Sequence, residues 1–243
     1  MDLIESGNIS ADDEFDHWWI STRFEYVERV LALASERQQA VSVIEFGCGT
    51  AQNLRFCRQR SRFKEKIDRV SGVDPGLIAA RRFTWMDDGD TVTPEVTGGL
   101  SYDVLLAMDV LEHIESDAEA LSHWLSFVKP GGFSLITVPA FDWLWSYHDE
   151  RLGHVRRHTR SSIERLAGRC GLERIRTRYA FGYMLPIAAG VRKLLRPKGE
   201  STDLRRHSAP VNWLFKRAGQ LEACFGGNRW AGTSVVGMFR KPS

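Results

Sequence analysis

Histidine and acidic side chains gather just after one predicted strand of the chain. His148 and Asp149 follow the apolar run at 133–140, and His154 comes next along the same segment. Histidine titrates near neutral pH, so it can act as a general base that removes a proton from a hydroxyl group. We predict His148 as the first catalytic candidate, His154 as the second and Asp149 as their acidic neighbour. His113, in LEHI, is a further candidate; in the alternative interpretation, these residues only hold their loops in place.

The same histidines have to be considered as metal ligands. His154 and His158 stand four residues apart, but the TRSS sequence that follows is typical of the start of a capped helix rather than its continuation. Arginines at 151, 156, 157 and 160 would also crowd a cation. We therefore predict no metal site. Arg156 and Arg157 could instead clamp a phosphate or carboxylate group.

A glycine-rich turn follows the first predicted strand, at 41–46. Gly47 and Gly49 stand where a side chain would block close approach of a ligand to the backbone. The turn is not the dinucleotide pattern GxGxxG, because it lacks the third glycine, and this argues against a nicotinamide oxidoreductase. Asp74 ends the next predicted strand, where a carboxylate can accept hydrogen bonds from both hydroxyls of a ribose. Glu45 could organise the turn or meet a ligand ammonium.

Apolar runs alternate with helical patterns through most of the chain. This alternation favours an α/β fold whose parallel sheet is covered on both faces. Strands are predicted at 41–46, 82–86, 102–108, 133–140, 172–178 and near 234–241, and a further strand ends at 73. Helices are predicted at 10–39, 53–63 and 115–128, with a short helix after Pro75 and another helix after Ser161. The segment 87–100 is predicted to be a loop. We divide the chain into an N-terminal helical cap (1–40), a core (41–178), a helical, aromatic and basic insertion (179–230) and a final strand (231–243).

Four motifs carry a resemblance to a known family. VIEFGCGTAQN, GVDP, YDVLLAMDVLEHI and KPGG, in this order, closely resemble class I S-adenosylmethionine-dependent methyltransferases over residues 41–140. The resemblance implies a Rossmann-like sheet of seven strands, mostly parallel with the last strand antiparallel. It also implies an N-terminal helix, a helical insertion before the last strand, and S-adenosylmethionine as the cofactor, with S-adenosylhomocysteine as its product.

The resemblance also assigns residues to the cofactor. It implies that Glu45, Gly47 and Gly49 line the methionine part, that Asp74 holds the ribose, and that Ala51 replaces the usual third glycine. Predicted beside these are Cys48 and Pro75, Met108 and Asp109 at the end of the fourth strand, and Met86 and Asp87 at the adenine edge.

The flanking sequences narrow the resemblance. HWWISTR and the segment from VPAFDWLW to HTRSSI resemble a bacterial subgroup often associated with glycosyltransferases and with cell-surface polysaccharide or lipid pathways. They are also similar, more distantly, to quinone-biosynthesis O-methyltransferases. In those enzymes an arginine of the N-terminal helix meets the cofactor carboxylate, and Arg23 is the matching residue. The alternative is that Arg23 is a solvent-facing helix residue.

Charge is distributed unevenly along the 243 residues. Residues 1–150 carry 13 Lys and Arg against 26 Asp and Glu, whereas 151–229 carry 18 against 5. The basic part favours an anionic partner, unless the two parts neutralise each other. The apolar stretch 179–191 and its basic flank are too short to span a bilayer, but residues 179–198 could lie at a membrane surface or form a lid. We expect a cytoplasmic protein, because its N-terminus lacks a signal-peptide pattern and its four cysteines lack zinc spacing.

These observations together predict methyl transfer to a hydroxyl of a small or lipid-linked, anionic acceptor such as a glycan, sugar or quinone-like molecule. Two alternatives stay open, namely an N-methyltransferase of a small metabolite and a cofactor-binding module without activity. A nucleic-acid acceptor is disfavoured, because the chain has no NPPY-type motif and no recognisable RNA-binding module. The sequence does not decide the oligomeric state.

Overall fold

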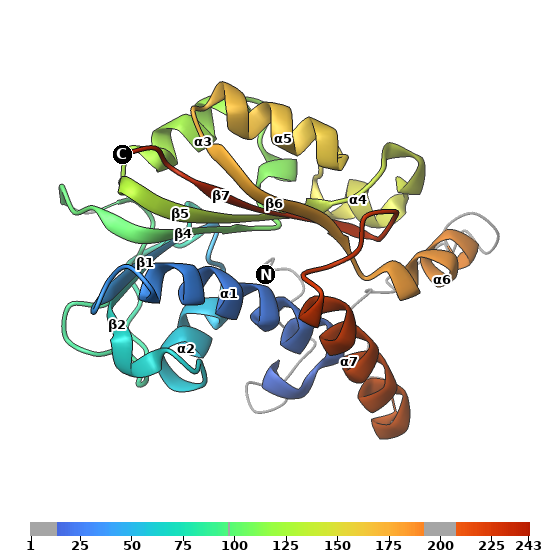
Figure 1. Cartoon of the computed structure of the whole chain (residues 1–243), viewed down its shortest axis with the longest axis horizontal. Coiled ribbons are helices and arrows are strands. Elements are labelled where there is room, and N and C mark those ends of the chain that lie inside the picture. The colour runs from blue at the N-terminus through green and yellow to red at the C-terminus, as the bar shows by residue number, and fades with distance from the viewer. Residues whose placement is uncertain (1–13, 97, 192–207) are drawn as a thin grey trace.

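A seven-stranded sheet in the order β3-β2-β1-β4-β5-β7-β6 separates two layers of helices (Figure 1). The computed structural model describes residues 14–96, 98–191 and 208–243. The strands are β1 Val41–Phe46, β2 Ile67–Val73, β3 Thr91–Thr93, β4 Tyr102–Met108, β5 Val128–Pro139, β6 Glu173–Ala180 and β7 Ser234–Arg240. Neighbouring strands run parallel from β3 to β5, whereas β7 runs antiparallel to both β5 and β6. This topology confirms the predicted fold, including the antiparallel last strand.

The central strands are apolar because helices cover them on both faces. Every residue of β1 and β4 is buried. Helices α3 (Asp117–Leu125) and α5 (Arg160–Arg169) lie on one face; α1 (Trp18–Ser35), α2 (Gln52–Gln59) and α7 (Ala209–Cys224) lie on the other (Figure 1). Two short helices, α4 (Tyr147–Leu152) and α6 (Leu185–Gly190), follow β5 and β6. Short 3-10 helices occur at Glu14–Asp16, Lys64–Lys66, Leu111–His113, Asp142–Leu144 and Gly182–Met184.

Helix α7 packs closely on the N-terminal helix α1. A Cβ at Gly219 would lie 2.1 Å from Oγ1 of Thr22, so only glycine allows the two helices to approach this far. The Trp18 amide donates a 2.9 Å hydrogen bond to Oδ1 of Asn212, and Arg29 donates to carbonyls at the end of α7. The predicted cap and insertion are therefore in contact, although the four-part division of the chain stays a prediction. The start predicted for the first helix, at Ser10, lies outside the described residues.

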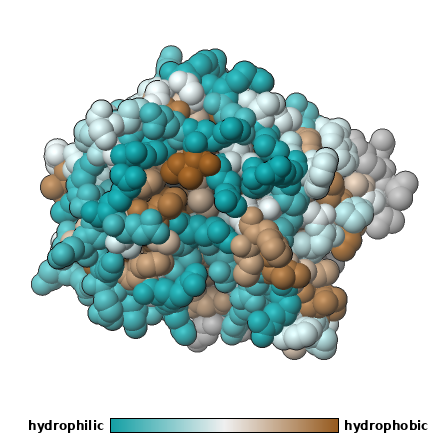
Figure 2. Space-filling model, viewed as in Figure 1, coloured by the Kyte–Doolittle hydropathy of each residue, from teal (hydrophilic) through white to brown (hydrophobic). Residues whose placement is uncertain are grey.

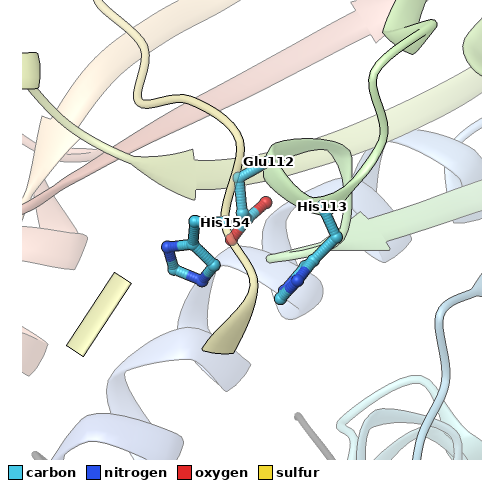
Figure 3. Close-up of side chains that lie close together, drawn as sticks. All are labelled: Glu112, His113 and His154. Atoms are coloured by element: carbon cyan, nitrogen blue, oxygen red, sulfur yellow. The ribbon is translucent and has the colours of Figure 1, made fainter. Parts of the chain in front are cut away.

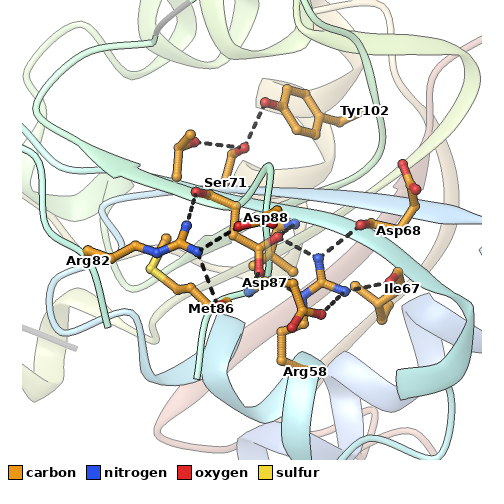
Figure 4. A network of polar contacts seen from close by, with 12 residues as sticks. Arg58, Ile67, Asp68, Ser71, Arg82, Met86, Asp87, Asp88 and Tyr102 are labelled. Atoms are coloured by element: carbon orange, nitrogen blue, oxygen red, sulfur yellow. Dashed lines mark hydrogen bonds and ion pairs between the residues drawn. The ribbon is translucent and has the colours of Figure 1, made fainter. Parts of the chain in front are cut away.

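The prediction for the third strand was wrong. Residues 82–86 form no strand, and β3 lies at Thr91–Thr93, inside the segment predicted as a loop. The buried carboxylate of Asp90 fixes this position, because it accepts hydrogen bonds from the Val70 amide on β2 and from Arg58 on α2. Figure 4 shows part of this network at the start of β2.

Two smaller predictions were also wrong. The short helix expected after Pro75 is a turn, in which Oδ1 of Asp74 accepts from the Gly76 amide. Helix α5 starts after Thr159, whose hydroxyl accepts from the Ser162 amide, rather than after Ser161. Within the described ranges, none of the helices combines the length and the apolar character needed to cross a membrane.

Candidate cofactor and acceptor site

The carboxyl ends of β1, β2 and β4 bring most of the predicted cofactor residues to one edge of the sheet. Glu45 lies near the end of β1, Asp74 directly follows β2, and Met108 ends β4. Since β1 is hydrogen-bonded to both other strands, these residues belong to one neighbourhood. In open α/β sheets, ligands bind outside the carboxyl ends of the strands.

The glycine-rich turn is tied to the end of β2. The Gly47 amide donates to the Val73 carbonyl at 2.8 Å, and the Gly49 amide donates to Oδ2 of Asp74 at 2.7 Å. Both glycines have positive φ, and a Cβ at Gly47 would lie 2.4 Å from Cγ2 of Val110. The close packing of this turn against Val110, just after β4, therefore requires glycine at position 47, independently of any ligand.

Other members of the turn have distinct roles. Ala51, in the place of the third family glycine, adopts the left-handed conformation with φ of 59°. The Cys48 side chain is buried and would collide with a Cβ at Gly72, so it faces the core and leaves only its backbone at the turn. Pro75 is exposed at the start of the next turn.

The Asp74 carboxylate can accept further hydrogen bonds from a ligand. Each of its carboxylate oxygens accepts one backbone hydrogen bond, from Gly49 and from Gly76. A carboxylate has about four lone-pair sites, so both oxygens can accept a further bond. The side chain is half-buried, which leaves part of it accessible. This geometry fits a pair of ribose hydroxyls.

Glu45 is a fully buried acid with one unsatisfied oxygen. Its Oε1 accepts from Nδ2 of Asn53, whereas Oε2 has no hydrogen-bond partner among the described residues. Burial raises the pKa of Glu45 to about 7, against the opposing effects of the Asn53 hydrogen bond and the Arg23 charge. A donor with positive charge would satisfy this oxygen, and the ammonium of S-adenosylmethionine is such a donor.

Arg23 reaches the same edge from α1. It is 4% exposed, so the alternative of a solvent-facing arginine is wrong. Its Nη2 lies 3.1 Å from Oδ2 of Asp109 and donates to the Met108 carbonyl at 3.3 Å, and its guanidinium lies over the Trp19 ring. Asp109 is held at φ of 55° by hydrogen bonds with Thr137. Nε of Arg23 has no partner in the described parts of the chain, which leaves one donor for a ligand.

Met86 and Asp87 do not join this edge, which corrects their prediction as adenine neighbours. Met86 packs in the core, and Asp87 lies 3.3 Å from Arg58, which also donates to the Ile67 carbonyl at the start of β2 (Figure 4). The start of β2 is at the opposite edge of the sheet from its carboxyl end. The prediction failed because it placed the third strand at 82–86, whereas β3 lies at Thr91–Thr93.

Asp149 organises the predicted catalytic segment. It is fully buried at the start of α4 and accepts hydrogen bonds from Ser146, His154 and Arg157, with Arg157 binding both oxygens at 2.7 and 3.0 Å. Burial favours the neutral acid, but the hydrogen bonds from His154 and Arg157 and the Arg157 charge hold the pKa of Asp149 well below its usual range. Asp149 is thus a fixed anion.

The Asp149 carboxylate orients His154. Nδ1 of His154 lies 2.9 Å from Oδ1 of Asp149, and an ionised carboxylate can only accept, so this nitrogen carries the proton. The other ring nitrogen, Nε2, is then the basic one. His148 is also buried on α4. The clamp predicted from Arg156 and Arg157 is already engaged within the protein, by Asp117 and Asp149 respectively.

Glu112 is a candidate site residue that the sequence analysis missed. The 3-10 helix after β4 brings Glu112 and His113 beside His154, and their nearest ligand atoms lie within 4.8 Å of one another (Figure 3). Oε2 of Glu112 is buried without a hydrogen-bond partner in the described residues, and burial followed by repulsion from Asp109 raises its pKa well above the usual range. The sequence feature that could have identified Glu112 is its position in the LEHI motif, next to His113.

This trio differs from the metal set that the sequence analysis considered and rejected. Glu112, His113 and His154 are grouped closely enough to hold a metal ion. His158, from the rejected set, turns away: its backbone bridges to Ala140 and its Nδ1 lies 3.3 Å from the Ser162 hydroxyl. Residues 108–113 therefore connect the predicted cofactor edge to the cluster of Glu112, His113 and His154.

The model of a methyltransferase-domain family matches residues 19–177. No curated protein matches the chain.

Several solved structures share this fold but are distant in sequence. They include phosphoethanolamine N-methyltransferase 2 of Haemonchus contortus, with phosphomonomethylethanolamine and S-adenosylhomocysteine (TM-score 0.54, 15% identity, 99% of this chain and 60% of that one). A SAM-dependent methyltransferase from Archaeoglobus fulgidus has a TM-score of 0.51 at 13% identity, over 89% and 94% of the two chains. The [4+2]-cyclase SpnF has a TM-score of 0.51 at 16% identity, over 88% and 80%. At these identities the likeness is one of fold alone.

Proposed function

Since the chain belongs to the class I methyltransferases that use S-adenosylmethionine, we propose that it methylates a hydroxyl group of a small or lipid-linked, anionic acceptor. The observation that carries this proposal is the hydrogen-bonded Asp149–His154 pair beside Glu112 and His113. A hydroxyl is a poor nucleophile until its proton is removed, and this pair is built for proton removal.

The cofactor supplies an activated methyl group, and the chain's own residues hold and orient it. We assign the ribose hydroxyls to Asp74, the ammonium to Glu45 and the carboxylate to Arg23. The glycine-rich turn lets the ligand approach the backbone. This assignment is supported by the open acceptor sites of Asp74 and by the unsatisfied Oε2 of Glu45.

In the proposed mechanism His154 is the general base. Asp149 keeps the proton on Nδ1, so Nε2 can accept the proton of the acceptor hydroxyl, and the fixed anion stabilises the imidazolium that results. Arg157 holds Asp149 in place through two hydrogen bonds. His148, the first candidate from the sequence, becomes the second.

The anionic character of the acceptor rests on the charge of the chain's later part, where 18 basic residues face 5 acidic ones between 151 and 229. Contact with a membrane through 179–198 remains a prediction, as does a cytoplasmic location. Of this segment the structure describes 179–191, where Ile187 and Val191 are exposed. A nucleic-acid acceptor stays disfavoured.

An amine acceptor is the second candidate, because the similar fold from Haemonchus contortus belongs to an N-methyltransferase with a phosphorylated amine bound. An amine that binds as the free base needs no general base. The two candidates therefore differ in how turnover responds to loss of His154.

The test uses methyl-labelled S-adenosylmethionine and host extract separated into organic, small aqueous and macromolecular fractions. Label in the organic or small aqueous fraction supports the proposal, and label in nucleic acid contradicts it. With the labelled acceptor in hand, His154→Ala should lower turnover by about 10²–10⁴ without weakening cofactor binding. Turnover within a few fold of wild type would exclude His154 as the base and favour the amine; His148→Ala is the matched comparison.

A further inference from the structure

Helix α7 carries an apolar stripe on the side that faces away from α1. Val211, Leu214, Leu221 and Phe225 recur at helical spacing, and their exposed fractions rise along the helix from 37% to 73%. The opposite side of α7, through Gly219, packs on α1. Figure 2 shows hydrophobic surface over α6 and α7 in the same view as Figure 1. A contiguous exposed stripe of this kind marks a contact surface.

A group of arginines lies near the end of this stripe at Phe225. A pocket of about 510 Å³ beside it is lined by Arg160 of α5, by Arg174, Arg176 and Arg178 of the edge strand β6, and by Arg229. Arg176 donates to the Phe225 carbonyl at 3.1 Å and so adjoins the end of the stripe, and Arg160 donates to the Arg229 carbonyl at 3.0 Å. We call these five residues the arginine cluster.

Within the described residues, the arginine cluster carries a net positive charge. The acid that pairs with it there is Glu164, which lies 3.1 Å from Arg174 and 3.8 Å from Arg160. The pKa of Arg178 is lowered, first by desolvation and then by repulsion from the other four guanidinium groups. A cluster of this sign attracts anions from its surroundings.

Exposed aromatic side chains complete the surface. Trp230, next to Arg229, is 87% exposed, and Trp213 of α7 is 59% exposed. Tryptophan and phenylalanine beside arginine are typical of protein surfaces that rest at the headgroup level of a bilayer, with the apolar parts inserted and the cations on the phosphates. The stripe supplies the apolar side chains that would insert into the bilayer, and the arginine cluster supplies the positive charge that would bind the lipid phosphates.

From this juxtaposition we propose that the α7 stripe, Trp230 and the arginine cluster form a docking surface for an anionic lipid bilayer. A second copy of this chain fits less well. The acid of α7, Glu222, is engaged with the Gly182 amide and Asn228, so α7 offers no negative charge to the arginine cluster of a partner. The proposal stands apart from the methyl-transfer reaction, because it concerns binding without acceptor or cofactor.

Flotation of the full chain with vesicles tests the proposal. We expect binding to vesicles of phosphatidylcholine with about 30% phosphatidylglycerol, weaker binding at high salt, and little binding to phosphatidylcholine alone. Arg229→Glu should weaken binding by about 25-fold, because each charge near such a surface changes affinity about fivefold. Arg81→Glu, an exposed arginine on the β2–β3 connection, is the matched control and should bind as wild type does.

The apolar part is tested with Leu221→Ser combined with Phe225→Ser. This variant should lose vesicle binding by at least about tenfold and keep the thermal stability of wild type, since both side chains are more than half exposed. A large loss of stability would mean that the chain itself covers the stripe, and would overturn the proposal. So would equal binding to neutral and anionic vesicles, or a dimer in solution that this variant dissociates without any vesicle binding.

Discussion

Replacing Asp149 by Asn tests whether a buried anion holds the acid–base cluster together. Asp149 and Arg157 are both nearly inaccessible, with side-chain exposures of 0% and 2%. Asn keeps the size of the side chain but removes the charge, and its amide nitrogen must face a donor. Loss of one partner of a buried ion pair costs about 3–5 kcal/mol. We therefore expect Asp149→Asn to lower the free energy of unfolding by about this amount at neutral pH.

The effect should depend on pH in one direction. The pKa of Asp149 is lowered in the folded protein, so its contribution is complete above the ordinary aspartate pKa of about 4. That contribution is lost as the pH falls towards the lower folded-state pKa. Wild type and Asp149→Asn should thus differ most above about pH 5 and converge in strong acid.

Urea unfolding followed by circular dichroism measures both effects. The control is Asp142→Asn, which changes an exposed aspartate on the preceding 3-10 helix and should alter stability by no more than about 0.5 kcal/mol. A difference below about 1 kcal/mol for Asp149→Asn, or one that grows towards acid pH, would refute the reasoning. Turnover should also fall by about 10²–10⁴, because Asn can no longer keep the proton on Nδ1 of His154.

Four further substitutions test the cofactor edge and the corrected position of β3. Asp74→Ala should weaken S-adenosylmethionine binding by roughly 1.5–3 kcal/mol in calorimetry; unchanged affinity would remove the ribose assignment. Wild-type affinity should rise with pH through about 7, where Glu45 ionises and can meet the ligand ammonium, and Glu45→Gln should abolish this dependence in the same titration. Asp90→Ala should cost about 3–5 kcal/mol of stability. By contrast, Asp87→Ala, at a side chain 70% exposed, should cost less than about 1 kcal/mol and leave cofactor affinity intact, whereas a loss of affinity would restore its adenine role.

The strands whose bounds could be predicted from the sequence are those that consist of a continuous run of apolar residues. The bounds of β1 at 41–46 and of β4 at 102–108 were predicted correctly, because strands covered on both faces are apolar without interruption. The three residues of β3 have no such signature. Their position depends on the Asp90 carboxylate, which binds α2 and β2 far away in the sequence.

The residues of the candidate site likewise divide into those that local sequence could predict and those that depend on contacts between distant residues. The positions of Gly47, Asp74 and Asp109 at strand ends could be predicted, because each follows a strand directly. The role of Glu112 could not, because it depends on contact with His154 across the fold. Choosing between His148 and His154 likewise required the Asp149 hydrogen bond, which the spacing of the residues does not reveal.

The unsatisfied groups of the site indicate what its ligands must bring. Among the described residues, the buried carboxylate oxygens without a hydrogen-bond partner are Oε2 of Glu45 and Oε2 of Glu112. Burial raises the pKa of both acids, and each unsatisfied group costs about 1–3 kcal/mol. One lies at the cofactor edge and the other beside His154, so the two ends of the site differ in what they need. The ammonium of S-adenosylmethionine can donate to Glu45 and so recover the cost at the cofactor edge. The single O–H of a hydroxyl acceptor is taken by Nε2 of His154 in the proposed mechanism, so Glu112, whose pKa is raised well above its usual range, is satisfied by holding a proton of its own.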